Sequence, residues 1–277
     1  MPKIISKEAI ITSVSYLLLP FDWLYQRGKG NNLAMIHLGR SGSTVLGDML
    51  NQHNRIRWTG EIYGKYIRRD PDNFYKMLPK KREWLLYQSL EKDRRGTVKK
   101  FYGYEIKFYH LHFMGESFSN YVQTVSKMGV KKFIVLERLN YLKVIISSLV
   151  ALQNGLWHIK EETSPSLTRV SVDVDDLWTD GESKTLMGFL DGYAHSFREA
   201  RNTLKDTNTL YLNYEEDILQ DPGIAYTKVC AFLKLPPKAP KTNYYRTNRY
   251  KLQDIIVNFD ELKYYLKGSQ YEWMLYE

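Results

Sequence analysis

The sequence lacks several features that would place it in common protein classes. Cys230 is the only cysteine among 277 residues, which excludes an intramolecular disulfide and a zinc site built on cysteines. Pro20 and Asp22 interrupt the apolar patch near the N-terminus well short of the roughly 20 residues that a membrane span requires. No cleavage site of small residues stands out after this patch. We therefore expect a cytoplasmic protein without a membrane span, in which residues 1–30 form an amphipathic segment.

The composition combines an excess of positive charge with a large apolar fraction. Forty basic residues against 31 acidic ones give a formal net charge of +9, and 43% of the residues are hydrophobic. This charge predicts an anionic partner, such as a phosphorylated cofactor, an acidic substrate, a nucleic acid or a membrane surface. The basic residues are spread along the chain and form no stripe with aromatic residues, which disfavours nucleic acid. The length suits one domain, which we place at residues 1–277.

Apolar runs typical of strands alternate with segments of helical periodicity along the chain. Strands that alternate with helices predict a mostly parallel sheet covered on both faces. We therefore predict an α/β, P-loop-like fold of three layers. The expected strands lie near residues 34–38, 101–108, 132–138 and 209–214, and the clearest expected helices near 117–128, 141–153 and 184–204.

Residues 33–52 carry the pattern of a strand, a tight loop and a helix. The apolar run stops at Gly39, a short loop follows, and apolar residues return at helical spacing after it. The backbone N–H groups of such a loop point to the space in front of the helix N-terminus, where the helix dipole is positive. A phosphate can bind there. Arg40 adds a forked set of donors that suits phosphate or sulfate oxygens. Glycine and hydroxyl residues complete the predicted anion site, namely Ser41, Gly42, Ser43 and Thr44.

This loop is not a Walker nucleotide loop. The Walker pattern has four residues between its first glycine and Gly-Lys-Ser/Thr, whereas only two residues separate Gly39 from Gly42, and no lysine precedes the hydroxyls. Arg-Ser-Gly-Ser-Thr at residues 40–44 instead resembles the 5′-phosphosulfate loop of sulfotransferases that use 3′-phosphoadenosine 5′-phosphosulfate (PAPS).

A second candidate anion site lies at the end of a later strand. Arg138 ends the apolar run at 132–138, and Ser147 follows nine residues later within the next expected helix. Ligands of open parallel sheets bind outside the carboxyl ends of the strands, so these two side chains could hold a further phosphate. The segment resembles the 3′-phosphate site of sulfotransferases, with Ser147 and Ser148 as alternatives for the serine. Residues 212–217 and 232–236 are similar to further segments of that family, and residues 252–262 resemble the ending of its bacterial and carbohydrate-type members.

The resemblance implies a cofactor and its binding residues. PAPS would give up its sulfonyl group and leave adenosine 3′,5′-bisphosphate (PAP), with no metal required. Arg40 and the N–H groups of residues 41–44 would hold the 5′-phosphate. Arg138 and Ser147 would hold the 3′-phosphate. Basic residues of the tail segment 241–277 would assist them, with no motif to choose among Lys241, Arg246, Arg249 and Lys251.

The acceptor group needs a base within hydrogen-bond reach. Trp-Thr-Gly-Glu at residues 58–61 looks like the segment that carries the base in bacterial and carbohydrate sulfotransferases, which makes Glu61 the first candidate. His110 is the alternative, because cytosolic members use a histidine after a lysine, although Lys107 and His110 differ from that spacing. Lys107 could contact the sulfonyl oxygens.

The sequence leaves the acceptor open. We predict sulfonyl transfer to a hydroxyl or amine of a small molecule or carbohydrate. One candidate acceptor is a bacterial (cyanobacterial) secondary metabolite such as a guanidinium toxin. Aromatic and acidic residues of the irregular stretch 155–181 could suit a cationic acceptor. A homodimer is possible. The alternatives to a sulfotransferase are a P-loop small-molecule kinase and a non-catalytic protein that binds anions or nucleic acid.

Overall fold

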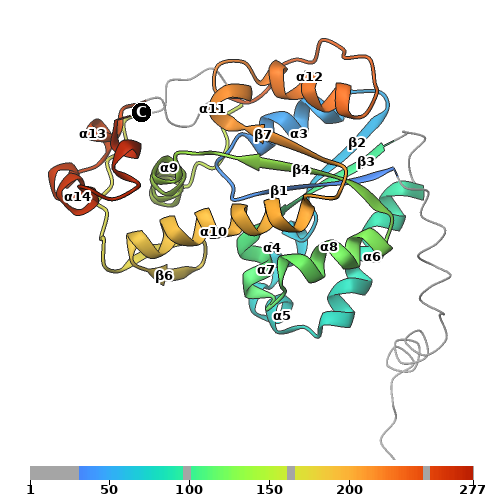
Figure 1. Ribbon diagram of the computed structural model, residues 1–277, viewed down its shortest axis with the longest axis horizontal. Helices are drawn as coiled ribbons and strands as arrows, with labels where there is room; N and C mark the ends of the chain where they lie inside the picture. Colours follow the sequence, from blue (N-terminus) through green and yellow to red (C-terminus); the bar gives the residue numbers. More distant parts are fainter. Residues whose placement is uncertain (1–30, 96–100, 161–165, 246–249, 277) are drawn as a thin grey trace, which may run out of the picture.

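In the computed structural model, which describes residues 31–95, 101–160, 166–245 and 250–276, five parallel strands form one sheet. The strand order is β2-β3-β1-β4-β7, so the first strand lies at the centre (Figure 1). The strands span Asn32–His37 (β1), Ile56–Glu61 (β2), Phe101–Lys107 (β3), Val130–Glu137 (β4) and Thr209–Asn213 (β7).

Alternate side chains of β1 point into two separate cores, because successive residues of a strand face opposite sides of its sheet. Leu33 and Met35 pack with helices α3 and α12 on one face, whereas Ala34 and Ile36 pack with α8 and α10 on the other (Figure 1). All four side chains are fully buried, as expected for a sheet covered on both faces. These helices span Ser43–Gln52 (α3), Phe118–Lys127 (α8), Leu186–Leu204 (α10) and Pro222–Phe232 (α12).

Side-chain caps fix where two long helices begin. Asn140 accepts a hydrogen bond from the backbone N–H of Lys143 at 2.9 Å at the start of α9, and Thr185 does the same for Gly188 at 3.0 Å at the start of α10. Each cap satisfies an N–H group that has no partner within the helix. The other elements are α4 (Gly64–Arg69), α5 (Pro71–Lys76), α6 (Pro79–Arg95), α7 (Phe108–Phe113), α9 (Tyr141–Asn154), β5 (Leu177–Thr179), β6 (Glu182–Lys184), α11 (Tyr214–Asp217), α13 (Leu252–Ile255), α14 (Phe259–Leu266) and the 3-10 helix η1 (Glu272–Leu275).

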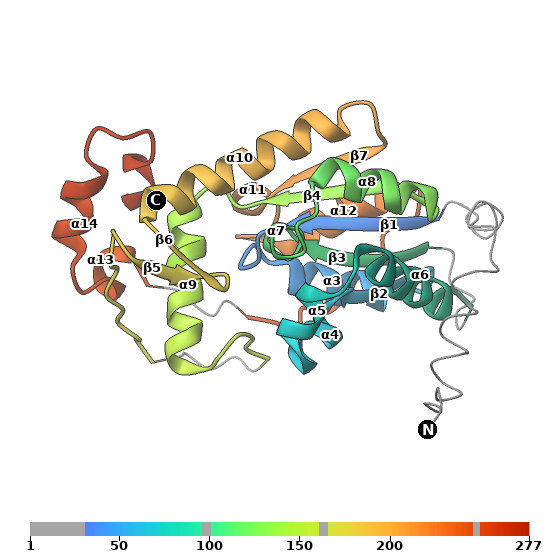
Figure 2. The ribbon, with the colours of Figure 1, turned by 90° about the horizontal axis from the view of Figure 1, so that it is seen from below.

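The strand register brings the carboxyl ends of neighbouring strands to one edge of the sheet. His37 of β1 pairs with Lys107 of β3, and Glu137 of β4 pairs with Asn213 of β7. Figure 2 shows that α9, the β5–β6 hairpin and the C-terminal helices α13 and α14 lie beyond this same edge. The segments that follow the strands therefore face the elements that close the molecule at this end.

The α/β fold with a central parallel sheet, predicted from the sequence, is confirmed. The expected helices near 117–128, 141–153 and 184–204 are α8, α9 and α10, each starting or ending within two residues of expectation. The amphipathic segment expected at 1–30 lies outside the described residues. Among the helices that the structure describes, none combines the length and apolar character needed to cross a bilayer.

Candidate active site

A cavity of about 1760 Å³ opens at the carboxyl ends of the strands. Pockets for one small ligand typically measure about 300–1,000 Å³, so this one has room for more than one small ligand. Its walls come from the loop after β1, the ends of β2 and β3, helices α5 and α9, residues 157–159, the β5–β6 hairpin, and residues 242–245 and 250–252.

The loop between β1 and α3 is shaped to hold an anion. Gly39 (φ 106°), Arg40 (φ 51°) and Gly42 (φ 80°) all adopt the left-handed backbone region. Gly42 is the N-cap of α3 and supplies no side-chain hydrogen bond, so the first N–H groups of the helix are left for another acceptor. The Ser41 hydroxyl is buried and has no hydrogen-bond partner among the described residues. An anion seated in this loop would satisfy these N–H groups, whereas Ser41 does not line the cavity.

Gly42 cannot be replaced without moving its surroundings. A Cβ atom built on it would lie 2.6 Å from Cγ2 of Ile218, which is too close for two non-bonded carbon atoms. Its positive φ angle is also one that residues with a side chain rarely adopt. The close packing of the loop against the α11–α12 region therefore requires glycine here.

Arg40 joins this loop to two distant segments. Its Nε donates to Oγ of Ser147 in α9 at 2.9 Å, and its Nη1 donates to the carbonyl oxygen of Trp157 at 2.8 Å. Arg138, which follows β4, donates from Nη1 to the carbonyl oxygen of Arg40 at 2.8 Å, and its guanidinium lies over the ring of Tyr214. Burial, and next the charge of Arg138, lower the pKa of Arg40 to about 10. Both guanidinium groups are therefore cationic at neutral pH and lie close together.

The two candidate serines of α9 have different neighbours. Ser147 accepts from Arg40, whereas Ser148 donates from its hydroxyl to the carbonyl oxygen of Val144 one turn earlier. Both line the cavity. The contact with Arg40 favours Ser147 for the anion site, while the spacing from Arg138 alone left the two open.

Glu61 and Lys107 form an ion pair at the ends of β2 and β3. Nζ of Lys107 lies 2.7 Å from Oε1 of Glu61, and both side chains line the cavity. Burial alone would raise the pKa of the Glu61 carboxyl, but the charge and hydrogen bond of Lys107 outweigh it and lower the pKa to about 2. Lys107 also lies 5.5 Å from the centre of the Tyr109 ring. Glu61 is therefore fully ionised at neutral pH and can accept a proton.

His110 lies behind the cavity wall. It is only 1% exposed in helix α7 and does not line the cavity. Burial, followed by the charge of Lys107, lowers its pKa to about 3, so the imidazole is neutral. This placement favours Glu61 over His110 as the group that meets an acceptor.

The remaining candidates from the sequence have mixed outcomes: some line the cavity, some lie away from it, and some lie outside the described residues. Arg246 and Arg249 belong to the residues that the structure does not describe. Lys241 does not line the cavity; its backbone exchanges hydrogen bonds with the side chain of Gln52. In the stretch 155–181, Trp157, His158 and Trp178 line the cavity, but the carboxylates of Asp173, Asp175 and Asp176 do not.

Asp180 is a candidate site residue that the sequence patterns did not single out. It lines the cavity at the turn of the β5–β6 hairpin. The signal that could have found it is Asp180-Gly181 between two short strands, because Asp-Gly is typical of a two-residue hairpin turn. This dipeptide predicts the turn, but it does not predict that the turn lies at the cavity.

Comparison with protein-family models finds no match, and comparison with curated proteins finds none. A sulfotransferase from Alicyclobacillus acidocaldarius is structurally similar, with a TM-score of 0.51 and 13% sequence identity over 88% of this chain and 95% of that chain. The sulfotransferase domain of the Synechococcus PCC 7002 olefin synthase aligns with a TM-score of 0.44 and 15% identity over 83% of this chain and 82% of that one. The chain therefore has the sulfotransferase fold, as its motifs predicted.

Proposed function

We propose that this protein transfers the sulfonyl group of PAPS to a hydroxyl or amine of a small-molecule or saccharide acceptor. The observation that carries the proposal is the convergence of Arg40, Arg138 and Ser147. They come from a loop, a strand end and a helix up to 107 residues apart, yet they are linked by direct hydrogen bonds. Two cations beside a loop with unused N–H and hydroxyl donors suit a ligand with more than one phosphate.

The donor-binding residues have distinct tasks in this proposal. PAPS would supply a sulfonyl group already activated by its link to a phosphate. Arg40 and the N–H groups at the start of α3 would bind that 5′-phosphate and stabilise the negative charge that grows on it. Arg138 and Ser147 would bind the 3′-phosphate. Positioning and electrostatics of this kind are the main contributions of a protein to transfer of a charged group.

Glu61 is the base in this proposal, and Lys107 is its partner. Because Glu61 is ionised, it can take the proton from an acceptor hydroxyl or amine. Nζ of Lys107 lies 3.8 Å from the point where a Cβ atom of Gly39 would sit, so it lies between the base and the anion loop. From there, its charge can offset negative charge on the transferred group. The Glu61 carboxylate becomes a stronger base when the charge of Lys107 is shared with the transferred group, because that charge lowers the pKa of Glu61.

Calorimetric titration with PAP tests the proposal. We expect the wild-type protein to bind PAP and to bind ATP with Mg²⁺ much more weakly. Arg40→Ala should weaken PAP binding by at least about tenfold, the effect of losing a charged hydrogen-bonded contact. Arg169→Ala is the matched control, because Arg169 is exposed and does not line the cavity.

Two results would contradict the proposal. One is a wild-type protein that does not bind PAP, and the other is an Arg40→Ala variant that binds it as well as the control does. A preference for ATP with Mg²⁺ would favour the kinase alternative. The acceptor as a bacterial secondary metabolite, a homodimer and a cytoplasmic location stay predictions.

A further inference from the structure

The turn of the β5–β6 hairpin places a carboxylate on the cavity wall. Asp180 (φ 52°) and Gly181 (φ 84°) form its two-residue loop, since Thr179 pairs with Glu182. Two successive positive φ angles are typical of a type I′ turn, which accepts Asn-Gly as readily as Asp-Gly. The turn therefore explains a small polar residue at position 180 but not its negative charge.

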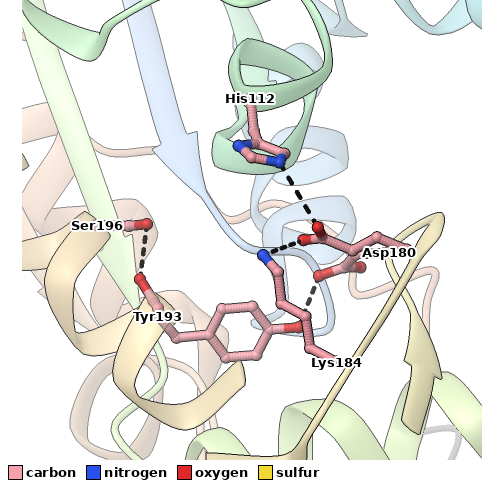
Figure 3. Close-up of polar contacts among 7 residues, drawn as sticks. His112, Asp180, Lys184, Tyr193 and Ser196 are labelled. Atoms are coloured by element: carbon pink, nitrogen blue, oxygen red, sulfur yellow. Dashed lines mark hydrogen bonds and ion pairs between the residues drawn. The ribbon is translucent and has the colours of Figure 1, made fainter. Parts of the chain in front are cut away.

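Asp180 forms no ion pair with the described residues, although the charges of Lys107 and Lys184 act on it from a greater distance. Its Oδ2 accepts a hydrogen bond from the hydroxyl of Tyr193 in α10 at 2.6 Å (Figure 3). The basic side chains drawn nearby, His112 and Lys184, pair instead with Glu182 at 3.5 and 2.7 Å. Burial raises the pKa of the Asp180 carboxyl, and the hydrogen bond from Tyr193 and the charge of Lys107 offset this only in part. A shielded carboxylate in this state gains free energy when a cation reaches it.

Thr179 presents a second unsatisfied group beside Asp180. It is 1% exposed, lines the cavity, and its hydroxyl has no hydrogen-bond partner within the described ranges. Buried polar groups are almost always hydrogen-bonded in native proteins. Together with Asp180, this hydroxyl offers acceptor atoms to a ligand that carries N–H groups.

Aromatic rings wall this end of the cavity. The rings of Tyr75 and Phe113 are 5.2 Å apart and those of Tyr109 and Phe113 are 6.4 Å apart, measured between centroids. The hairpin packs directly on this cluster, because a Cβ atom on Gly181 would lie 3.2 Å from the Phe113 ring. Trp178, 55% exposed, lines the cavity from the same hairpin. Aromatic faces attract cations as well as apolar groups.

We propose that Asp180 is a specificity-determining residue that binds an ammonium or guanidinium group of the acceptor, with the aromatic cluster packed around it. This proposal rests on the proposed function, since it assigns the acceptor half of the cavity. The charges along the cavity agree with it: Arg40 and Arg138 make the donor end cationic, and Lys107 is neutralised by Glu61 between the two ends. Asp180 then leaves the acceptor end with a net negative charge.

Other charged groups also line the cavity: Lys143 and Glu215 are partly buried, and three more are exposed. Arg68, Asp72 and Lys76 lie on α4 and α5 with exposed side chains. Water and salt screen charges in such positions strongly. These exposed groups contribute little to the choice between a cationic and a neutral acceptor. Lys143 and Glu215 have opposite formal charges and add no net charge to the cavity, so Asp180 is the deciding charge.

The test compares two small probes that differ in charge and hardly in shape. Benzamidinium and neutral benzamide are titrated calorimetrically into the full-length protein without nucleotide. We expect the wild type to bind benzamidinium about tenfold or more tightly than benzamide. Asp180→Asn keeps the turn chemistry and the group that accepts from Tyr193, and it should abolish this preference. Asp175→Asn removes the same charge from an exposed position that does not line the cavity, and it should retain the preference.

Equal affinity of the wild type for the two probes, no binding of benzamidinium to the wild type, or a preference that survives in Asp180→Asn would each overturn the proposal. A PAP titration of the same proteins separates this failure from that of the proposed function. Asp180→Asn should bind PAP as the wild type does. A wild type that prefers benzamidinium but does not bind PAP would retain the cation site and reject sulfonyl transfer.

Discussion

Lys107→Met should change the acidity of Glu61 more than any other single substitution in the cavity. Methionine keeps the unbranched shape of lysine and removes the charge that lies 2.7 Å from the carboxylate. In the wild type, Lys107 overcomes the effect of burial and lowers the pKa of Glu61 from an ordinary 4.5 to about 2. Without it, burial becomes the main influence on Glu61, and the pKa should rise above 4.5.

The free energy that Lys107 contributes to the ionised form of Glu61 follows from the size of this pKa change. A fall from 4.5 to about 2 corresponds to about 3 kcal/mol in favour of the ionised carboxylate. The side chains of Lys107 and Glu61 are only 19% and 29% exposed, so water screens this interaction less than it screens a surface ion pair. Because the folded-state pKa is lowered, the stabilisation is present above pH 4.5 and is lost as the pH falls toward 2.

Carbon-13 NMR titration of the glutamate carboxyl groups measures this directly, with Glu61→Gln used to assign the signal. The Glu61 resonance should titrate near pH 2 in the wild type and above 4.5 in Lys107→Met. In urea unfolding, the free energy of unfolding of the wild type should exceed that of Lys107→Met at pH 7. This difference should decrease as the pH falls from 4.5 toward 2. Lys80→Met, on an exposed part of α6, should leave the Glu61 signal unchanged. A wild-type pKa near 4.5, or the same pKa in Lys107→Met, would refute the reasoning.

Two further substitutions probe the base and the anion loop. Glu61→Gln should lower turnover by about a hundredfold or more while PAP affinity is retained, the usual scale for a positioned base; full activity in Glu61→Gln together with an inactive His110→Ala would assign the base to His110. Gly42→Ala should lower the free energy of unfolding by about 1–3 kcal/mol, because the new methyl group meets Ile218 and the positive φ angle is unfavourable. Urea denaturation measures that loss, and a variant as stable as the wild type would contradict the close packing of this loop.

Local sequence patterns predicted four of the five strands of the central sheet, but not β2, and the helices α8, α9 and α10. The loop after β1 was predicted because Gly39, Arg40 and Gly42 sit between an apolar run and a helical pattern, all within a few residues. Arg138 was found because it follows a buried strand, and residues in that place lie at the carboxyl edge of a parallel sheet. In both cases the signal is local, and the topology of alternating strands and helices brings the two places together.

The remaining site features depend on contacts that no local pattern encodes. The ion pair between Glu61 and Lys107 exists because β2 and β3 are neighbours in the sheet, although their residues are 46 positions apart. The contact of Arg40 with the Trp157 carbonyl depends on how the chain after α9 folds back. Asp180 reaches the cavity through packing of its hairpin on Phe113. Such pairings follow from tertiary packing, which a single sequence does not reveal.

The carboxyl ends of the strands are aligned with one another, and this alignment limits where the chain can accept insertions. His37 and Lys107 are direct neighbours across β1 and β3, and each residue added to a strand advances it by about 3.3 Å and turns the following side chains to the opposite face. One extra residue inside β3 would thus carry Lys107 away from Glu61 and point it toward a core. Insertions at the amino ends of the strands leave the cavity intact. Natural or designed variants of this chain should therefore differ in length at one end of the sheet and keep it constant at the other.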